Sequence, residues 1–344
     1  MRYVSLGQSG LKVSPICLGA MAFGSPQWQQ WTIGEEASRR VVSRALELGI
    51  NFFDTADVYS NGLSEVILGK ALKEFADRSQ VVIATKVSGP MGPGPNQRGL
   101  SRSHILDAVE ASLKRLQTDY LDLYYVHRWD YETPIEETLE ALNDLVRSGK
   151  VRYLGASSMF AWEFACALHL QEQNHWSRFV AMQNHYNLLY REEEREMIPL
   201  CRHYGVAVLP WSPLARGVLT GNRKLSKSDG YRGARATAPG FEAQSLRAKT
   251  DEYSLRLYCW EEDYLVAECC LEIARSRGVP ASHVALAWLL KNPAVSAPVL
   301  GPSRVEHIEE AVGALAFRLD EAEIRALEEV YVPHPVLGHE GRSK

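Results

Sequence analysis

The sequence predicts an α/β fold, a closed (β/α)8 TIM barrel with an N-terminal β-hairpin and long loops on its C-terminal face. Eight apolar stretches of strand length alternate with amphipathic stretches of helix length. The strand stretches are almost continuously hydrophobic, which is typical of parallel strands covered on both faces. No shift in composition divides the 344 residues, so we expect one domain over residues 1–344. An open doubly wound sheet is the rival fold, but the GxGxxG motif that usually follows its first strand is absent.

Taken in order, the elements repeat a strand followed by a helix. The expected strands cover residues 15–19, 50–54, 81–87, 121–127, 151–157, 179–183, 206–211 and 297–301. The expected helices cover residues 35–48, 64–75, 103–116, 135–147, 159–171, 191–204, 264–277 with 282–291, and 304–315. Gly49 and Gly149 each follow a helix and suit the left-handed conformation that ends one. The acidic run REEERE (191–196) is expected to form a solvated first helical turn, where carboxylates favour the helix dipole.

Three further segments lie outside this repeat. Residues 3–6 and 11–13 flank a Gly-containing turn and predict a hairpin that could plug one end of the barrel. The Pro/Gly-rich stretch 89–99 and the segment 214–260 both follow strands, so they emerge at the C-terminal face, where barrel active sites lie. Residues 222–250 carry seven basic and two acidic residues. We expect the 214–260 segment to order over an anionic cofactor and to be cleaved near Arg232 or Arg235 without it. The tail around residues 334–339 could fold over the barrel mouth.

Composition excludes several classes of protein. Lys and Arg number 38 against 42 for Asp and Glu, so the chain lacks the basic excess of a nucleic-acid binder. No apolar run approaches the roughly 20 residues that a membrane helix needs. The six cysteines have neither metal-site nor disulfide-framework spacing, and no HExxH motif is present. We therefore expect a cytoplasmic protein with no metal, and a metal-dependent barrel hydrolase or isomerase would lack its ligands.

Charged residues stand at the ends of three consecutive expected strands. Asp54 and Tyr59 belong to DTADVY after the second strand, Lys86 ends the third, and His127 ends the fourth. A lysine and an aspartate in apolar strands are costly unless paired, and neighbouring parallel strands allow Asp54 and Lys86 to meet. A purely structural ion pair is the alternative. Four chemically matched groups on three adjacent strand ends favour a functional site.

In this order, DTADVY, TKV and VHRWD resemble the motifs of the aldo-keto reductases. The opening LGQSGLKVSPICLGAMAFG is similar to the hairpin and first strand of that family, and GASS (155–158), QN (183–184), WSPL (211–214) and GPSR (301–304) are similar to its later motifs. The resemblance runs from about Tyr3 to about Val330. It is strongest to the aryl-alcohol dehydrogenase-like branch and the related channel β-subunits. It implies that Tyr59 is the general acid, Lys86 its activator, Asp54 the partner of Lys86, and His127 the residue that orients the substrate carbonyl.

The resemblance also implies NADP(H) as the cofactor. Ser157 and Gln183 would hold the nicotinamide carboxamide, and the indole of Trp211 would stack on the ring. Ser303 and Arg304 begin a helix, and a guanidinium at a helix N-terminus suits a 2′-phosphate. Further cofactor contacts are expected from Gly19, Met21, Asp54, Ser158, Ser212, Leu214, Gly217, Gly301, His307 and Glu310. Ser158 stands where many members have Asn.

The resulting functional prediction is an oxidoreductase that reduces aldehydes or activated ketones, aromatic, aliphatic or sugar-derived, with NADPH. Trp28 and Trp129 are expected to line the pocket for this small-molecule carbonyl substrate. The alternative is a regulatory subunit that binds NADPH as a redox sensor and turns over little, since channel β-subunits keep the same four residues. The sequence makes no prediction of the oligomeric state.

Overall fold

A closed barrel of eight parallel strands forms the centre of the computed structural model, which describes residues 1–225 and 241–339. Each strand pairs with its neighbours in the order β12-β3-β4-β5-β6-β7-β8-β9. The strands are β3 (Cys17–Gly19), β4 (Phe52–Asp54), β5 (Val82–Val87), β6 (Leu121–Val126), β7 (Val151–Ser157), β8 (Phe179–Gln183), β9 (Ala207–Val208) and β12 (Val299–Leu300). The sheet closes through the backbone, because Val299 N donates to Pro210 O at 2.8 Å and Val208 N donates to Ala294 O at 2.9 Å. The barrel prediction is therefore confirmed, and the open sheet is excluded.

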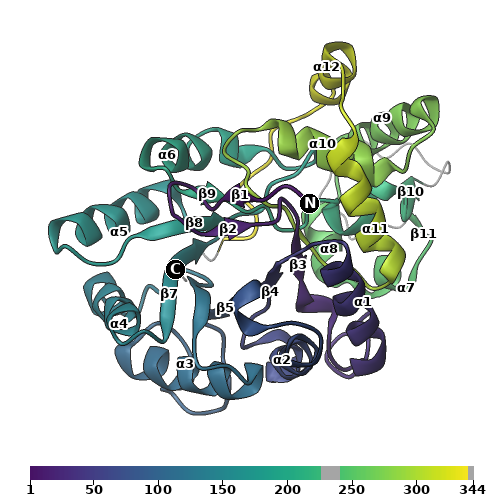
Figure 1. Ribbon diagram of the computed structural model, residues 1–344. Helices are drawn as coiled ribbons and strands as arrows, with labels where there is room; N and C mark the ends of the chain where they lie inside the picture. Colours follow the sequence, from purple (N-terminus) through teal and green to yellow (C-terminus); the bar gives the residue numbers. More distant parts are fainter. Residues whose placement is uncertain (226–240, 340–344) are drawn as a thin grey trace.

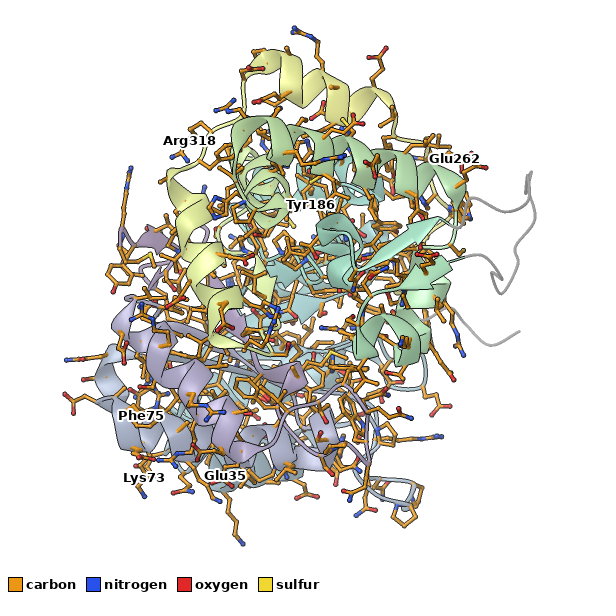
Figure 2. All side chains as sticks on the ribbon, turned by 90° about the vertical axis from the view of Figure 1, so that its right-hand side faces the viewer. Glu35, Lys73, Phe75, Tyr186, Glu262 and Arg318 are labelled. Carbon is orange, nitrogen blue, oxygen red and sulfur yellow. The ribbon has the colours of Figure 1, made fainter. Side chains whose placement is uncertain are left out.

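Helices surround the strands as an outer ring (Figure 1). They are α1 (Glu35–Glu47), α2 (Leu63–Phe75), α3 (Arg102–Leu116), α4 (Ile135–Arg147), α5 (Ala161–Gln173), α6 (Met197–Tyr204), α9 (Glu261–Arg277), α10 (Ala281–Lys291) and α11 (Val305–Gly313). Figure 2 shows Glu35, Lys73 and Phe75 on the outer side of α1 and α2. The inner faces of these helices pack on the strands, which are buried throughout on β5 and β6, as expected for strands covered on both sides.

The N-terminal hairpin closes one end of the barrel, as predicted. Its strands β1 (Val4–Ser5) and β2 (Lys12–Val13) are antiparallel and lie across the near end of the barrel in Figure 1. Leu6 and Val13 are fully buried in the same apolar cluster as the barrel-interior residue Phe52. Gly7 has φ +57° and approaches the backbone so closely that a Cβ would lie 2.4 Å from Gly205 O, so only glycine fits there. The plug leaves the opposite end of the barrel open.

Two parts of the periphery differ from the sequence prediction. The run 191–196 is not the first turn of a helix: a 3-10 turn (Glu192–Glu194) precedes α6, which begins only at Met197. Glu193 is buried rather than solvated, and it accepts a 2.5 Å hydrogen bond from the Asn184 side chain. The solvated-turn prediction is wrong for Glu192–Glu194, whose carboxylates accept hydrogen bonds from Tyr331, Asn184 and Tyr186. An additional helix, α12 (Glu321–Glu329), follows α11.

The long segment after β9 and the C-terminal tail both lie at the open end of the barrel. The segment contains the antiparallel pair β10 (Arg223–Leu225) and β11 (Phe241–Ala243), then α7 (Leu246–Thr250) and α8 (Glu252–Leu257). Arg232 and Arg235, at which we expect cleavage, lie outside the described residues. In the tail, Leu337 N donates to the Tyr190 hydroxyl at 3.1 Å. None of the helices in the described ranges is long and apolar enough to cross a membrane.

Candidate active site

A cavity of about 1860 Å³ opens at the carboxyl ends of the barrel strands. It collects nearly all of the residues that the sequence proposed for a site. Its wall includes Gly19, Met21, Trp28, Asp54, Tyr59, His127, Ser157, Gln183, Trp211, Ser212, Leu214, Gly217, Gly301, Ser303, Arg304, His307 and Glu310. Lys86 and Ser158 are buried and contact residues of this wall. Trp129 is not among the described residues that line the cavity; its ring lies 6.4 Å from that of Trp162.

Asp54 and Lys86 form a buried ion pair at the bottom of the cavity. Asp54 is the last residue of β4 and Lys86 lies near the end of β5, so the two parallel strands deliver both side chains to the same level. Lys86 Nζ lies 2.5 Å from Asp54 Oδ1 and donates a second hydrogen bond of 2.7 Å to Thr55 O. The other carboxylate oxygen of Asp54 accepts from Gln183 Nε2 at 2.9 Å. Every oxygen of the carboxylate is thus occupied.

Burial and charge act in opposite directions on this pair. Burial raises the pKa of Asp54. Burial alone would lower the pKa of Lys86, but the Asp54 carboxylate outweighs it and holds the pKa of Lys86 above its usual value. Lys86 therefore remains a cation at neutral pH, which places a fixed positive charge beneath the cavity floor.

Tyr59 and His127 lie above the ion pair. Lys86 Nζ lies 5.1 Å from the centroid of the Tyr59 ring. The centroid of the His127 ring lies 5.8 Å from that of the Tyr59 ring, and the two rings are edge to face. Burial, and then the charge of Arg128, hold the pKa of His127 well below its usual value. His127 is therefore a neutral imidazole that can donate one hydrogen bond. A phenol and an imidazole side by side over an ammonium can hold and protonate an oxygen that becomes negative.

The backbone after Tyr59 is held in an unusual conformation. Ser60 and Asn61 have φ of 49° and 53°, in the left-handed region that non-glycine residues rarely adopt. Gly24 approaches so closely that a Cβ there would lie 1.8 Å from Ser60 Oγ. Strained turns of this kind persist where the surroundings fix them, and they cluster at functional sites. Here the turn directs the Tyr59 ring into the cavity.

Polar groups of β7 and β8 meet a stacked aromatic wall on the other side of the cavity. Ser157 Oγ donates to Gln183 O at 2.9 Å, and the indole Nε1 of Trp211 donates to Ser158 Oγ at 2.9 Å. Behind Trp211, the His185 ring stacks flat at 4.3 Å and 11°. Burial holds the pKa of His185 well below its usual value, so this imidazole is neutral. The indole of Trp211 is thus a fixed platform with one face toward the cavity.

The N-terminus of α11 forms another part of the wall. Arg304 Nη2 lies 3.0 Å from His307 Nε2, and Ser303 N donates to the other ring nitrogen of His307 at 3.3 Å. In residues 1–225 and 241–339, no carboxylate lies within ion-pair distance of Arg304, so its exposed guanidinium is open to an anion.

Several cavity residues were not predicted from the sequence. Arg216 and Arg247 share the carboxylate of Asp251, at 2.5 and 3.1 Å, and the Arg247 guanidinium also lies 4.3 Å from the Trp31 ring. This cluster joins the segment after β9 to the loop after β3. Arg128 also lines the cavity. The only sequence signal for these residues was their place in loops at the C-terminal face of the barrel.

The donor set of this cavity fits a nicotinamide dinucleotide. Ser157 and Gln183 supply polar groups beside the flat face of Trp211, and the α11 N-terminus with Arg304 supplies an anion site in the same cavity. Within the described ranges, no three His, Cys, Asp or Glu side chains are grouped so that they could hold a metal ion.

Comparison with known proteins agrees with this geometry. Residues 15–332 match the model of the Aldo/keto reductase family. Versiconal hemiacetal acetate reductase of Aspergillus parasiticus is 43% identical over 357 residues, an alignment that covers 98% of each chain. An aldo-keto reductase of Alternaria alternata is 44% identical over 361 residues, covering 98% of this chain and 93% of the relative. A Schizosaccharomyces pombe protein provisionally named an aryl-alcohol dehydrogenase is 39% identical over 360 residues, covering 98% and 97%.

Proposed function

The chain belongs to the aldo/keto reductase family, a family of oxidoreductases, and from this premise we propose that it reduces aldehydes or activated ketones to alcohols with NADPH. The whole chain, residues 1–344, would act as one domain in the cytoplasm on a small-molecule carbonyl compound. The observation that carries the proposal is the buried Asp54–Lys86 pair directly beneath Tyr59 and His127.

Each of the four side chains has a distinct task in this reaction. A nicotinamide cofactor held by Ser157, Gln183 and Trp211 would supply the hydride for the carbonyl carbon. Tyr59 donates the proton that the carbonyl oxygen needs as it becomes an alkoxide, and the positive charge of Lys86, 5.1 Å from the centre of its ring, attracts the negative charge left on the phenol oxygen. His127, as a neutral imidazole, donates a hydrogen bond to the same oxygen and orients it. Asp54 keeps Lys86 charged and fixed.

The same proposal assigns the cofactor-binding residues. Ser157 and Gln183 would hold the carboxamide, Trp211 would stack on the nicotinamide ring, and Ser158 would fix the indole from which it accepts a hydrogen bond. The Arg304 guanidinium at the start of α11 supports a 2′-phosphate, and therefore NADP(H). The remaining contacts would come from Gly19, Met21, Ser212, Leu214, Gly217, Gly301, Ser303, His307 and Glu310.

Aromatic carbonyl compounds are the first substrates to test. Trp28 lines the cavity with its ring 6.4 Å from that of Tyr59, so an aromatic ring can pack beside the reacting carbonyl. Among the relatives, one is named as an aryl-alcohol dehydrogenase and another as a reductase of versiconal hemiacetal acetate. Both names agree with an aromatic or similarly bulky substrate.

The decisive experiment is steady-state oxidation of NADPH with 4-nitrobenzaldehyde, followed by absorbance, with alcohol formation measured in parallel. Many turnovers per protein molecule, abolished in Tyr59→Phe, are expected. Oxidation of a single equivalent of bound NADPH, followed by arrest, would instead favour the redox-sensing regulatory subunit.

A further inference from the structure

The guanidinium of Arg128 lies in the cavity wall beside the residues proposed to bind the carbonyl. Arg128 directly follows His127 after the end of β6 and is half-buried. Its Nη1 donates to the backbone oxygen of His127 at 2.6 Å and lies 3.4 Å from Ser157 Oγ. These contacts turn the side chain from the strand end back toward the cavity. Without these two contacts, an arginine at the end of a strand could extend its side chain into water.

The charge of Arg128 has a different environment from the charges of two other arginines in the cavity wall. Arg216 and Arg247, in the same cavity wall, share the carboxylate of Asp251. By contrast, no carboxylate in the described parts of the chain lies within ion-pair distance of Arg128. Its positive charge acts on the site, since it helps to hold down the pKa of His127 after burial. A guanidinium carries five N–H donors in a planar fork, and within residues 1–225 and 241–339 only those on Nη1 have a hydrogen-bond partner.

The cavity that Arg128 lines also contains aromatic rings, and together they favour a flat aromatic ligand with an anionic group. Trp28 contributes a ring to the wall near Tyr59, and Trp31 packs edge-on against Trp28 at 6.3 Å. A half-buried guanidinium gains most from a planar oxyanion, which it can bind through two parallel hydrogen bonds. An anionic group on the substrate would give this cation an ion-pair partner that the described residues do not supply.

We propose that Arg128 is a specificity-determining residue that binds an ionised oxygen substituent of the substrate, so that the preferred substrates are aromatic carbonyl compounds with a carboxylate or an ionised phenol on the ring. The inference rests on the proposed reductase function and adds the substrate class to it. In this arrangement Trp28 packs on the ring, Arg128 holds the oxyanion, and the carbonyl reaches Tyr59 and His127.

The test compares substrates that differ in charge but little in shape. 3-Carboxybenzaldehyde is paired with its methyl ester, and 3-hydroxybenzaldehyde, above the pKa of its phenol, is paired with 3-methoxybenzaldehyde. The values of kcat/KM are measured with NADPH for the wild-type protein, Arg128→Met and Arg128→Lys. Arg318→Met is the matched control, because Arg318 is exposed on the far periphery and, in the described parts of the chain, its side chain bonds only to backbone oxygens near it (Figure 2). The dissociation constant of NADPH is measured for each protein by fluorescence.

We expect the wild-type protein to favour the anion of at least one pair by about tenfold to a hundredfold, as for a charge-assisted hydrogen bond. Arg128→Met should reduce that ratio to about one, and Arg128→Lys should restore part of it, with NADPH affinity unchanged throughout. The pair that shows the preference identifies the substituent as carboxylate or phenolate.

Three results would overturn the inference. A ratio of the two kcat/KM values near one in both substrate pairs, measured on the wild-type protein alone, would already overturn it. A ratio that survives in Arg128→Met would assign the preference elsewhere, and an equal loss on all four aldehydes with weaker NADPH binding would make Arg128 a cofactor ligand. Failure of the wild-type protein to reduce any of the four would instead remove the proposed reductase function, and this inference with it.

Discussion

Lys86 Nζ lies 2.5 Å from Asp54 Oδ1, and the two side chains are 0% and 2% exposed. A buried pair of this kind costs desolvation energy on both sides, so its presence is weak as an argument for stability. Its place beneath Tyr59 gives it a chemical use. Stability and activity should therefore respond differently when the pair is changed.

Lys86→Met leaves the Asp54 carboxylate buried without its counter-ion. We expect the free energy of unfolding to fall by about 3–5 kcal/mol and kcat to fall by about a hundredfold or more. In the double variant Asp54→Asn with Lys86→Met, no buried charge remains, so most of the stability should return while kcat stays low. Urea unfolding and aldehyde reduction, measured on the same preparations, separate the two effects. Recovery of activity together with stability would show that the pair is only structural.

A second buried carboxyl group should make stability depend on pH. Asp57 is fully buried; its Oδ1 accepts from Val58 N at 2.6 Å, and its Oδ2 has no hydrogen-bond partner within the described residues. Burial, and then the carboxylate of Glu65, raise the pKa of Asp57 to about 7. The folded protein therefore binds this proton more tightly than the unfolded chain, in which an aspartate has a pKa of about 3.9. Stability from Asp57 is present at low pH and is lost as the pH rises from about 4 through 7.

Asp57→Asn should remove this dependence. Between about pH 5 and pH 8 the wild-type free energy of unfolding should fall by about 3 kcal/mol more than that of the variant. Asp77→Asn, on the exposed side of the barrel, serves as the control and should follow the wild-type curve. Urea unfolding at several pH values measures both. Parallel curves for the wild type and Asp57→Asn would contradict a protonated Asp57.

The barrel could be predicted because each strand and each helix of the repeat has its own pattern of apolar residues. β5 and β6 are continuous apolar runs, and α4 has a clear amphipathic pattern, so period and length identify both kinds of element. The helix α12 was missed although its start carries a capping box, in which Asp320 and Glu323 each accept from the backbone of the other. It follows α11 with no strand between them, so it stands outside the strand–helix repeat on which the prediction is based. The role of Glu193 was missed because burial of a glutamate depends on a partner, Asn184, that only the fold brings near.

Some residues of the candidate active site could likewise be predicted from the sequence, and others could not. Asp54 and Lys86 could be paired from the sequence because parallel strands end at the same face of a barrel. Arg128 and His185 could not, since the turns after the strands decide where those side chains point. Ser158 and Ser212 have φ of 45° and 52°, and no pattern of apolar residues predicts such turns. Neither Arg128 nor His185 was assigned to the site before the fold was known.

Arg304 should decide between NADPH and NADH. Its guanidinium is exposed at the first turn of α11, held by His307, whose pKa burial and the arginine keep below its usual value. Loss of a charge-assisted contact to a 2′-phosphate is worth roughly 1.5–3 kcal/mol. Arg304→Ala should therefore raise the dissociation constant of NADPH about tenfold to a hundredfold and leave that of NADH almost unchanged. Fluorescence titration with both nucleotides measures this, and an equal loss for both would show that Arg304 does not bind the 2′-phosphate.

Catalysis should depend on the Tyr59 hydroxyl far more than on the Tyr59 ring. Tyr59→Phe retains the ring contacts with Trp28 and His127 but removes the group placed to protonate the alkoxide. General acid catalysis of this kind is worth about 10²–10⁴-fold in rate, and one donor to the alkoxide is lost with it. The variant should bind NADPH with near wild-type affinity while kcat falls by about a hundredfold or more. Added to Lys86→Met, the change should cost little further, because the two residues act as one unit. If Tyr59 were only a packing residue, turnover would be nearly intact and stability slightly reduced. A Tyr59→Phe variant that retains more than about a tenth of the wild-type kcat on a good aldehyde would rule out Tyr59 as the proton donor.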